Sequence, residues 1–295
     1  NRELRRFPPM CWLLTQKPSA QEWLLLALHD VAAATIRDLK DAGYSVAAKD
    51  ILRLRQNGVS ADYLVMLRRG GCEFSIDDIL KLRRAGVQAE YPVTLKKAGF
   101  ELPASEIVSL RHSGVAVEYF LSLKKADPTV SSEQVVKLRH SGIGAEYFTG
   151  VRQILPEVSG SEIIKLRNAG ISADYLKQWR SFDISWEDVI KLRSAGVPVE
   201  YATALKTAGY ALAPDPIIKL RHAGVPVDYF GAVKKAGFDL TWEELIQLRR
   251  AGVTAEYLAA LHAPGQKNLS AEVIIDLRRR GVPAETIKQI RAPAN

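Results

Sequence analysis

An arginine that follows a leucine is the most regular polar side chain of this sequence. An acidic residue comes seven positions after each copy, as Asp62 does after Arg55. A ladder of guanidinium groups could bind phosphate or carboxylate. Because the acids recur as often as the arginines, we expect each pair to meet across a short turn and to hold the fold. The arginines are Arg55, Arg83, Arg111, Arg139, Arg167, Arg193, Arg221, Arg249 and Arg278.

Histidines are the next candidates for chemistry. His112, His140 and His222 occupy one position of a recurring phrase, so adjacent copies would stand on the order of 10 Å apart, the usual helix spacing. Zinc needs its ligands about 2 Å from one ion. The sequence also lacks His-Glu-x-x-His, a Gly-rich phosphate loop and a Ser-His-Asp arrangement. We therefore predict neither a metal, nor a cofactor, nor an enzymatic activity.

The residue directly after each Leu-Arg pair varies from copy to copy. Variation at a fixed place in a regular pattern is what a surface that selects a partner requires. We take these residues as candidate contacts to a partner, or to bases if the partner is a nucleic acid. They are Gln56, Arg84, His112, His140, Asn168, Ser194, His222, Arg250 and Arg279.

Repeats must position these side chains. Residues 189–202 read VIKLRSAGVPVEYA, and residues 217–230 read IIKLRHAGVPVDYF. The glycine of this phrase returns every 28 residues, except for intervals of 26 before Gly196 and 29 before Gly281. A fainter phrase, such as Leu95 to Gly99, lies between the copies, so each repeat has two halves of about 14 residues. Fixed spacing of this kind indicates a repeat protein.

Start and stop signals make each half a short helix. Gly86 is expected just past a helix end in the left-handed conformation, with Val87 contacting Leu82. Capping boxes are predicted where a serine or threonine stands three residues before a glutamine or glutamate. Helices this short are stable only when they stack on neighbours. The boxes are Ser131–Gln134, Ser159–Glu162 and Thr241–Glu244.

The predicted fold is all-α, an α-solenoid of about nine 28-residue helical hairpins. The solenoid spans 31–290, preceded by an apolar N-terminal cap at 1–30 and followed by a C-terminal tail at 291–295. The register is strained at 150–160, near 180–184 and at 262–269, where we expect bends.

Charge and composition limit the function classes. With 41 basic and 33 acidic residues, the formal charge is +8, which permits contact with nucleic acid or anionic lipid without requiring it. The longest apolar run, Trp23 to Leu28, is too short to cross a bilayer, so no membrane insertion is expected. Cys11 and Cys72 provide no disulfide framework, which favours the cytoplasm. Because the chain begins with Asn1, we expect a processed or excised piece.

The repeated phrase resembles helical repeats of bacterial proteins. It reads Leu-Arg-x-x-Gly-Val-x-x-Glu/Asp-Tyr and is followed by Leu-Lys/Arg-x-Ala-Gly-Phe/Tyr, and its clearest copy is 245–257. Similar repeats occur in the soluble tails of membrane metallopeptidases of the antibiotic-sensor type. The resemblance implies a helical interaction array rather than a peptidase.

A second resemblance is to the repeats of TAL effectors. Ser132 to Val136, followed by a turn at His140 to Gly142, is similar to their repeat, in which a variable pair in the inter-helix turn reads one base. That resemblance implies base reading by the variable residues. The period of 28 departs from the family, and so do the acids, such as Glu146, at the start of every second helix. An acid beside each phosphate would repel it.

We therefore predict a non-catalytic scaffold that binds a protein or peptide partner, with a modular nucleic-acid-binding protein as the alternative. Small residues in the middle of the second helices would allow close helix packing or line a shallow groove for a partner. These residues are Thr94, Ser122, Gly150, Ala204, Ala232 and Ala260.

Overall fold

The computed structural model describes residues 19–28, 31, 33–45, 47–262 and 269–291. Over these ranges the chain forms twenty α-helices and the short 3₁₀ helix η3 (Arg180–Phe182), with no β-strand. It divides into two compact units, residues 1–164 and 165–295, and the division falls within α11 (Gly160–Asn168). The prediction of an all-α helical-repeat solenoid is confirmed within each unit.

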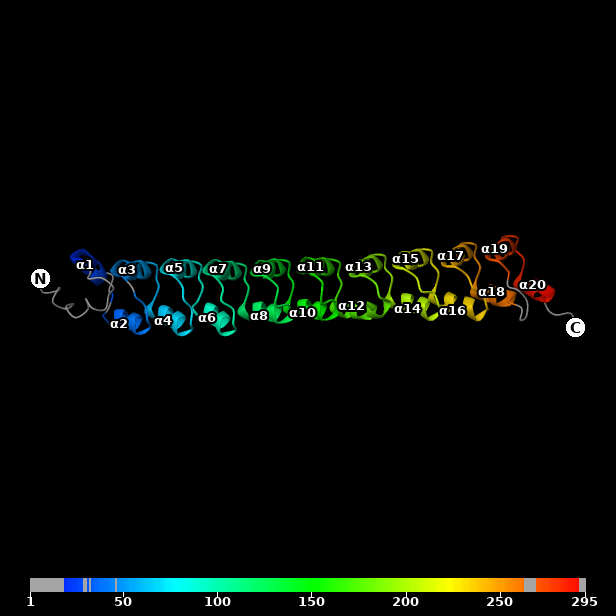
Figure 1. Cartoon of the computed structure of the whole chain (residues 1–295). Coiled ribbons are helices and arrows are strands. Elements are labelled where there is room, and N and C mark those ends of the chain that lie inside the picture. The colour runs from blue at the N-terminus through cyan, green and yellow to red at the C-terminus, as the bar shows by residue number, and fades with distance from the viewer. Residues whose placement is uncertain (1–18, 29–30, 32, 46, 263–268, 292–295) are drawn as a thin grey trace. The chain divides into compact units, whose positions relative to one another are not determined.

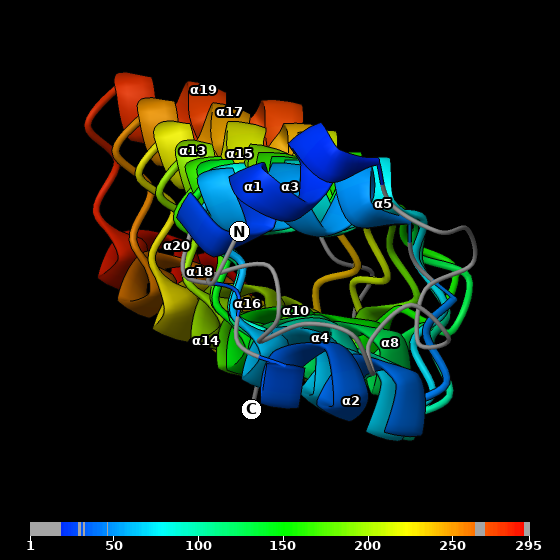
Figure 2. The same ribbon diagram turned by 90° about the vertical axis from the view of Figure 1, so that its left-hand side faces the viewer.

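The N-terminal unit has two layers of helices. The first helices of successive repeats lie side by side in one layer, and the second helices lie side by side in the other (Figures 1 and 2). The first layer holds α1 (Ala20–Leu28), α3 (Ala48–Gln56), α5 (Ile76–Arg84), α7 (Ala104–His112) and α9 (Ser132–His140). The second layer holds α2 (Ala33–Asp41), α4 (Ala61–Arg69), α6 (Glu90–Lys97), α8 (Val117–Ala126) and α10 (Ala145–Ile154).

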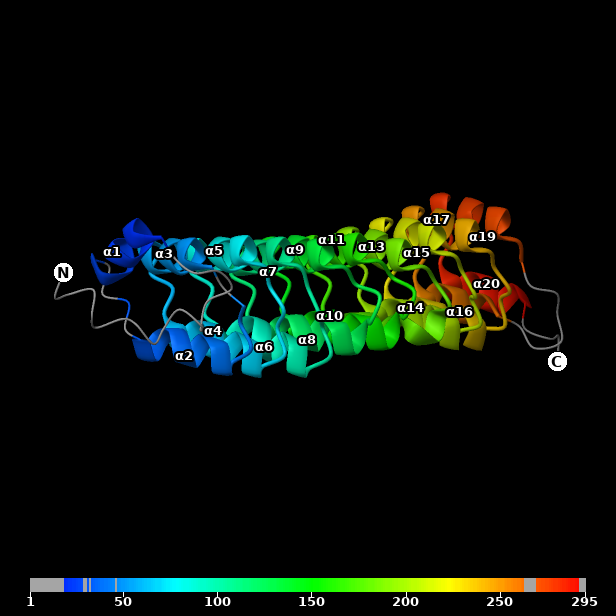
Figure 3. The same cartoon turned by 60° about the vertical axis from the view of Figure 1, so that its left-hand side comes forward.

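The C-terminal unit repeats this arrangement. Contacts join successive first helices from α13 to α19 and successive second helices from α14 to α20 (Figure 3). The first helices are α13 (Trp186–Ser194), α15 (Pro214–His222), α17 (Trp242–Arg250) and α19 (Ala271–Arg279). The second helices are α12 (Ala173–Trp179), α14 (Val199–Thr207), α16 (Val227–Lys235), α18 (Ala255–Leu261) and α20 (Ala284–Arg291).

The helix ends form as the sequence predicts. The N–H of Val87 donates to the carbonyl of Leu82 at 3.0 Å, and the N–H of Gly86 donates to that of Arg83 at 3.0 Å. Gly86 has φ +67°, as this Schellman motif requires. The capping boxes at Ser131 and Thr241 are complete, and the backbone N–H groups of Ser159 and Glu162 bond reciprocally to each other's side chains.

The core lies between the two layers. Ile79 and Leu82 of α5 are fully buried, and so are Val87 at the turn and Leu95 of α6, at 0 to 1% exposure. Each short helix therefore buries one apolar stripe against its neighbours, and stacking supplies the stability that a lone helix lacks.

The repeat near 180–184 has 26 residues instead of 28, and the structure accommodates the shorter length within this repeat. Helix α12 has seven residues, and η3 follows it directly. Asp183 then takes φ +51°, whereas Gly99 and Gly209 fill the left-handed position after α6 and α14. Most of the predicted bend at 262–269 lies outside the described residues, which resume at 269.

The predicted N-terminal cap is described only at 19–28. There α1 packs on α3, and Leu26 is 2% exposed. Residues 1–18 and 29–30 of that cap lie outside the described residues, as do 292–295 of the predicted tail. No helix in the described part combines the length and the apolar character needed to cross a membrane.

Candidate functional site

A tyrosine in the first turn of the second helix links successive repeats. Its hydroxyl donates to the backbone carbonyl just after the glycine of the next repeat. This bond satisfies both the buried hydroxyl and a carbonyl at the turn. The bonds are Tyr63 to Val87 at 3.1 Å, Tyr91 to Val115 at 2.9 Å, Tyr119 to Ile143 at 2.8 Å, Tyr201 to Val225 at 2.9 Å, Tyr229 to Val253 at 3.2 Å and Tyr257 to Val282 at 3.0 Å.

The recurring arginine reaches back to the preceding repeat. The Nε of Arg139 donates to the carbonyl of Gly114 at 3.2 Å, and its guanidinium lies 5.6 Å from the ring centroid of Tyr119. Three other arginines make the same bond, each at 3.1 Å: Arg83 to Gly58, Arg249 to Gly224 and Arg278 to Gly252.

The predicted pairing of this arginine with the acid seven positions later is wrong for these four residues. Among the described ion pairs, none joins Arg139 to Glu146 or the other three to the equivalent acid. The acid lies exposed in the first turn of the second helix, where it favourably meets the positive end of the helix dipole. The guanidinium of Arg139 instead contacts a turn carbonyl and the face of a tyrosine ring, both in the preceding repeat.

The 26-residue repeat breaks the tyrosine series. Tyr175 holds the same position, but its buried hydroxyl has no hydrogen-bond partner. The corresponding carbonyl, of Val197, is 22 residues further on, whereas the bonds that form span 24 or 25 residues. Arg193 still stacks on the Tyr175 ring at 5.1 Å. The shortened repeat therefore keeps the stacking contact and loses the hydrogen bond.

The variable residues all lie exposed on the first helices. Each is the last residue of its helix, one per repeat, and the cavities described below are lined by other side chains. Arg84 bonds through Nε to Oδ1 of Asn57 at 2.9 Å, so this one contacts the preceding turn. Within the described ranges, no group of three His, Cys, Asp or Glu side chains could hold a metal. Within each unit, the structure thus presents the variable residues singly, one per repeat, at the ends of the first helices.

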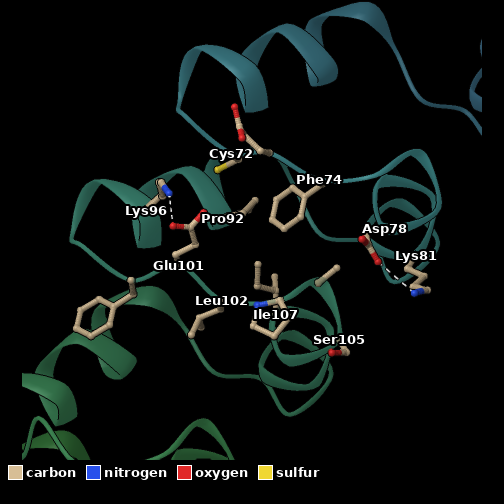
Figure 4. Close-up of a pocket in the computed structure, with 14 residues that line it drawn as sticks. Cys72, Phe74, Asp78, Lys81, Pro92, Lys96, Glu101, Leu102, Ser105 and Ile107 are labelled. Carbon is tan, nitrogen blue, oxygen red and sulfur yellow. Dashed lines mark hydrogen bonds and ion pairs between the residues drawn. The ribbon is translucent and has the colours of Figure 1, made fainter. Parts of the chain in front are cut away.

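Loop-edge cavities lie where a second helix passes into the next first helix. The one in Figure 4 has a volume of about 280 Å³. Phe74, Pro92 and Ile107 supply apolar walls, and an ion pair between Lys96 and Glu101, at 2.6 Å, lies at the cavity. Cys72 also lines it, and burial raises the pKa of that thiol. A cavity of about 430 Å³ occupies the equivalent positions of the C-terminal unit.

Outer grooves run between neighbouring second helices. The groove between α4 and α6 has a volume of about 460 Å³, with Met66 and Val93 among its lining residues. The groove between α14 and α16 has about 970 Å³, and Ala204 and Gly231 occupy the same two repeat positions. Smaller side chains at these two positions accompany the wider groove, whose lining also extends to Gln178 of α12.

The wide groove coincides in part with the small residues predicted from the sequence. Ala204 lines it, in agreement with the second of the two alternatives given for these residues, whereas the next lining residue of this kind is Gly231 rather than its neighbour Ala232. Sequence reasoning missed Gly231 because it followed one helical position through every repeat. A glycine in the middle of a predicted helix was the available signal, since glycine there is unfavourable.

No family model matches the chain, and no curated protein matches it. The resemblances to metallopeptidase-tail repeats and to TAL-effector repeats therefore stay predictions.

Proposed function

We propose that this chain is a non-catalytic helical-repeat scaffold that binds a protein or peptide partner along the outer face of its second helices. The wide groove between α14 and α16 is the observation that carries the proposal. It is about 970 Å³ in volume and is lined largely by small and apolar side chains of α14 and α16, with Gln178 of α12 also in its lining. A groove of this kind, formed by stacked short helices, suits a helical or extended segment of a partner.

Charge at the turn edge supports a protein partner over a nucleic acid. The variable residues end the first helices, and exposed acids such as Glu118 and Glu200 begin the second helices just beyond the same turns. A phosphate backbone that followed the variable residues would meet an acid at each turn. The free, buried thiol of Cys72 supports a cytoplasmic location as part of this proposal.

A crosslinking selection tests the proposal. Random peptides displayed on phage are selected on the full chain and then crosslinked to variants that carry a benzophenone side chain at one position. Thr207 is exposed and lines the wide groove, whereas His222 is exposed at the variable edge. We expect the selected peptides to crosslink from Thr207 and not from His222.

The alternative function is measured on the same protein. Fluorescent single- and double-stranded DNA and RNA are titrated at 50 mM and 200 mM salt. Tight binding that weakens steeply with salt would show that phosphate contacts dominate. That result, together with selected peptides that fail to crosslink from Thr207, would overturn the proposal.

A further inference from the structure

The length of the wide groove suits a short helix. Its lining residues on α14 run from Val199 to Thr207, which is eight steps of about 1.5 Å, or about 12 Å along the axis. A segment of about ten residues in helical form would fill that length, whereas only about four extended residues would do so.

The groove floor is apolar even where threonines line it. The hydroxyl of Thr203 donates to the carbonyl of Val199 at 2.9 Å, and that of Thr207 donates to the carbonyl of Thr203 at 2.9 Å. These hydroxyl hydrogens are therefore used within α14. With Ala204 and the half-exposed Val227, the threonine methyl groups offer a partner mostly hydrocarbon.

Gly231 makes the groove deeper at this point, although packing within the fold does not require a glycine there. A Cβ atom built on Gly231 meets nothing within 4 Å, whereas one built on Gly70, in the narrow groove, would lie 2.4 Å from a methyl of Val93. Packing thus requires the glycine at 70 and does not require it at 231. Because glycine weakens a helix interior, its place at 231 is best explained by the close approach of another backbone.

The two ends of the groove carry opposite charges. Glu200 lies at the end where α14 begins, and Lys235 lies where α16 ends. Lys234 is held by Asp239 at 2.5 Å, but Lys235 is exposed and forms no ion pair among the described residues. Helices favour acids in their first turn and bases in their last turn. A helix antiparallel to α14 would place its acids at Lys235 and its bases at Glu200.

We propose that the partner segment is an amphipathic helix of about ten residues, bound antiparallel to α14 and α16 in the groove over Gly231. Its inward face carries small and medium apolar side chains, its first turn an acid beside Lys235, and its last turn a base beside Glu200. This inference rests on the proposed function and specifies its partner.

Designed peptides test this partner. The probe is a fluorescein-labelled, hydrocarbon-stapled 12-residue helix with glutamates in the first turn, lysines in the last turn and alanine and leucine on one face. Its twin has the two charge sets exchanged. We expect the full chain to bind the probe with a Kd in the micromolar range and the twin about tenfold more weakly, measured by fluorescence polarisation.

Two variants locate the site, each with a control. Gly231→Ala adds a Cβ atom that meets nothing within 4 Å, so the fold tolerates it, and probe binding should weaken about tenfold because a second backbone can no longer approach as closely. Lys235→Glu should weaken binding of the probe about tenfold and should strengthen binding of its charge-exchanged twin. Lys97→Glu changes the same repeat position in the narrow groove and should leave both affinities unchanged.

Three results would overturn the helical partner. One is no binding of the probe at 1 mM, and another is equal binding of probe and twin. The third is equal binding of an unstapled peptide with proline at its centre, which cannot form the helix. A proline peptide that binds and crosslinks from Thr207 would overturn the helix while leaving the scaffold proposal standing.

Discussion

Removing one hydroxyl from each of two tyrosines should change the stability of the chain in opposite directions. Tyr201 is fully buried and donates to the carbonyl of Val225 at 2.9 Å, whereas the buried hydroxyl of Tyr175 has no partner. Both lie in the C-terminal unit, in the first turn of a second helix, and both have an arginine stacked on the ring. Substitution by phenylalanine keeps the ring and the stacking and removes only the oxygen.

The expected magnitudes follow from what each oxygen does. Tyr201→Phe removes a hydrogen bond worth about 1 kcal/mol and leaves a carbonyl at the turn without that donor, so unfolding should become easier by about 1–2 kcal/mol. Tyr175→Phe removes a hydroxyl that loses its hydration on burial and gains no hydrogen bond in exchange. The free energy of unfolding should therefore rise by about 0.5–1 kcal/mol.

Urea denaturation followed by circular dichroism at 222 nm measures both changes, provided that the dependence of the unfolding free energy on urea concentration is the same in both variants. Because repeats unfold locally as well as globally, hydrogen exchange by mass spectrometry should report the same signs. Protection should fall around 199–225 in Tyr201→Phe and not around 175–197 in Tyr175→Phe. Equal destabilisation by both substitutions would refute the account of the shortened repeat.

Three further changes probe the same architecture. Arg139→Ala should cost about 1 kcal/mol in urea, and Glu146→Ala should add independently to it, because the two side chains do not pair; strong coupling in the double mutant would contradict this. Gly86→Ala, at φ +67° with open space around it, should cost about 1 kcal/mol of thermal stability from strain alone. Burial raises the pKa of Tyr229 from 10 to about 12, so its proton is held more tightly in the fold. Stability should therefore be kept below pH 10 and fall between pH 10 and 12, with tyrosinate absorbance at 295 nm rising as the chain unfolds.

The fold was accessible from the sequence because its determinants are local. The glycine at Gly86, the apolar residue after it and the capping box at Ser131 each act within one helix end, and repetition multiplies a weak signal. The same local rules do not describe contacts between repeats. The arginine's real partner is 25 residues away, at Gly114 for Arg139, whereas the acid seven positions further along the sequence, Glu146, was the wrong choice.

The tyrosine series could have been read from the sequence. A residue used only for packing would alternate among phenylalanine, leucine and tyrosine, yet tyrosine stands at this position in eight repeats, from Tyr63 to Tyr257. Persistent choice of a hydroxyl on a half-buried ring indicates a hydrogen bond. Only the structure shows that the acceptor is the turn of the next repeat, because the distance between repeats depends on how the helices stack.

The candidate site was harder to predict than the fold, because it depends on a departure from the repeat. Residues that recur in every repeat are those that the stacking of the helices requires. Because they are the same in each repeat, they cannot select one partner over another. Gly231 differs from Val93 at the same position and Ala204 differs from Met66, and these two differences accompany a groove about twice as large. In a molecule whose repeats share one scaffold, binding specificity must come from positions where the repeats differ without loss of packing. The open space around Gly231 meets that condition, since a Cβ atom there would meet nothing within 4 Å and would narrow only the groove.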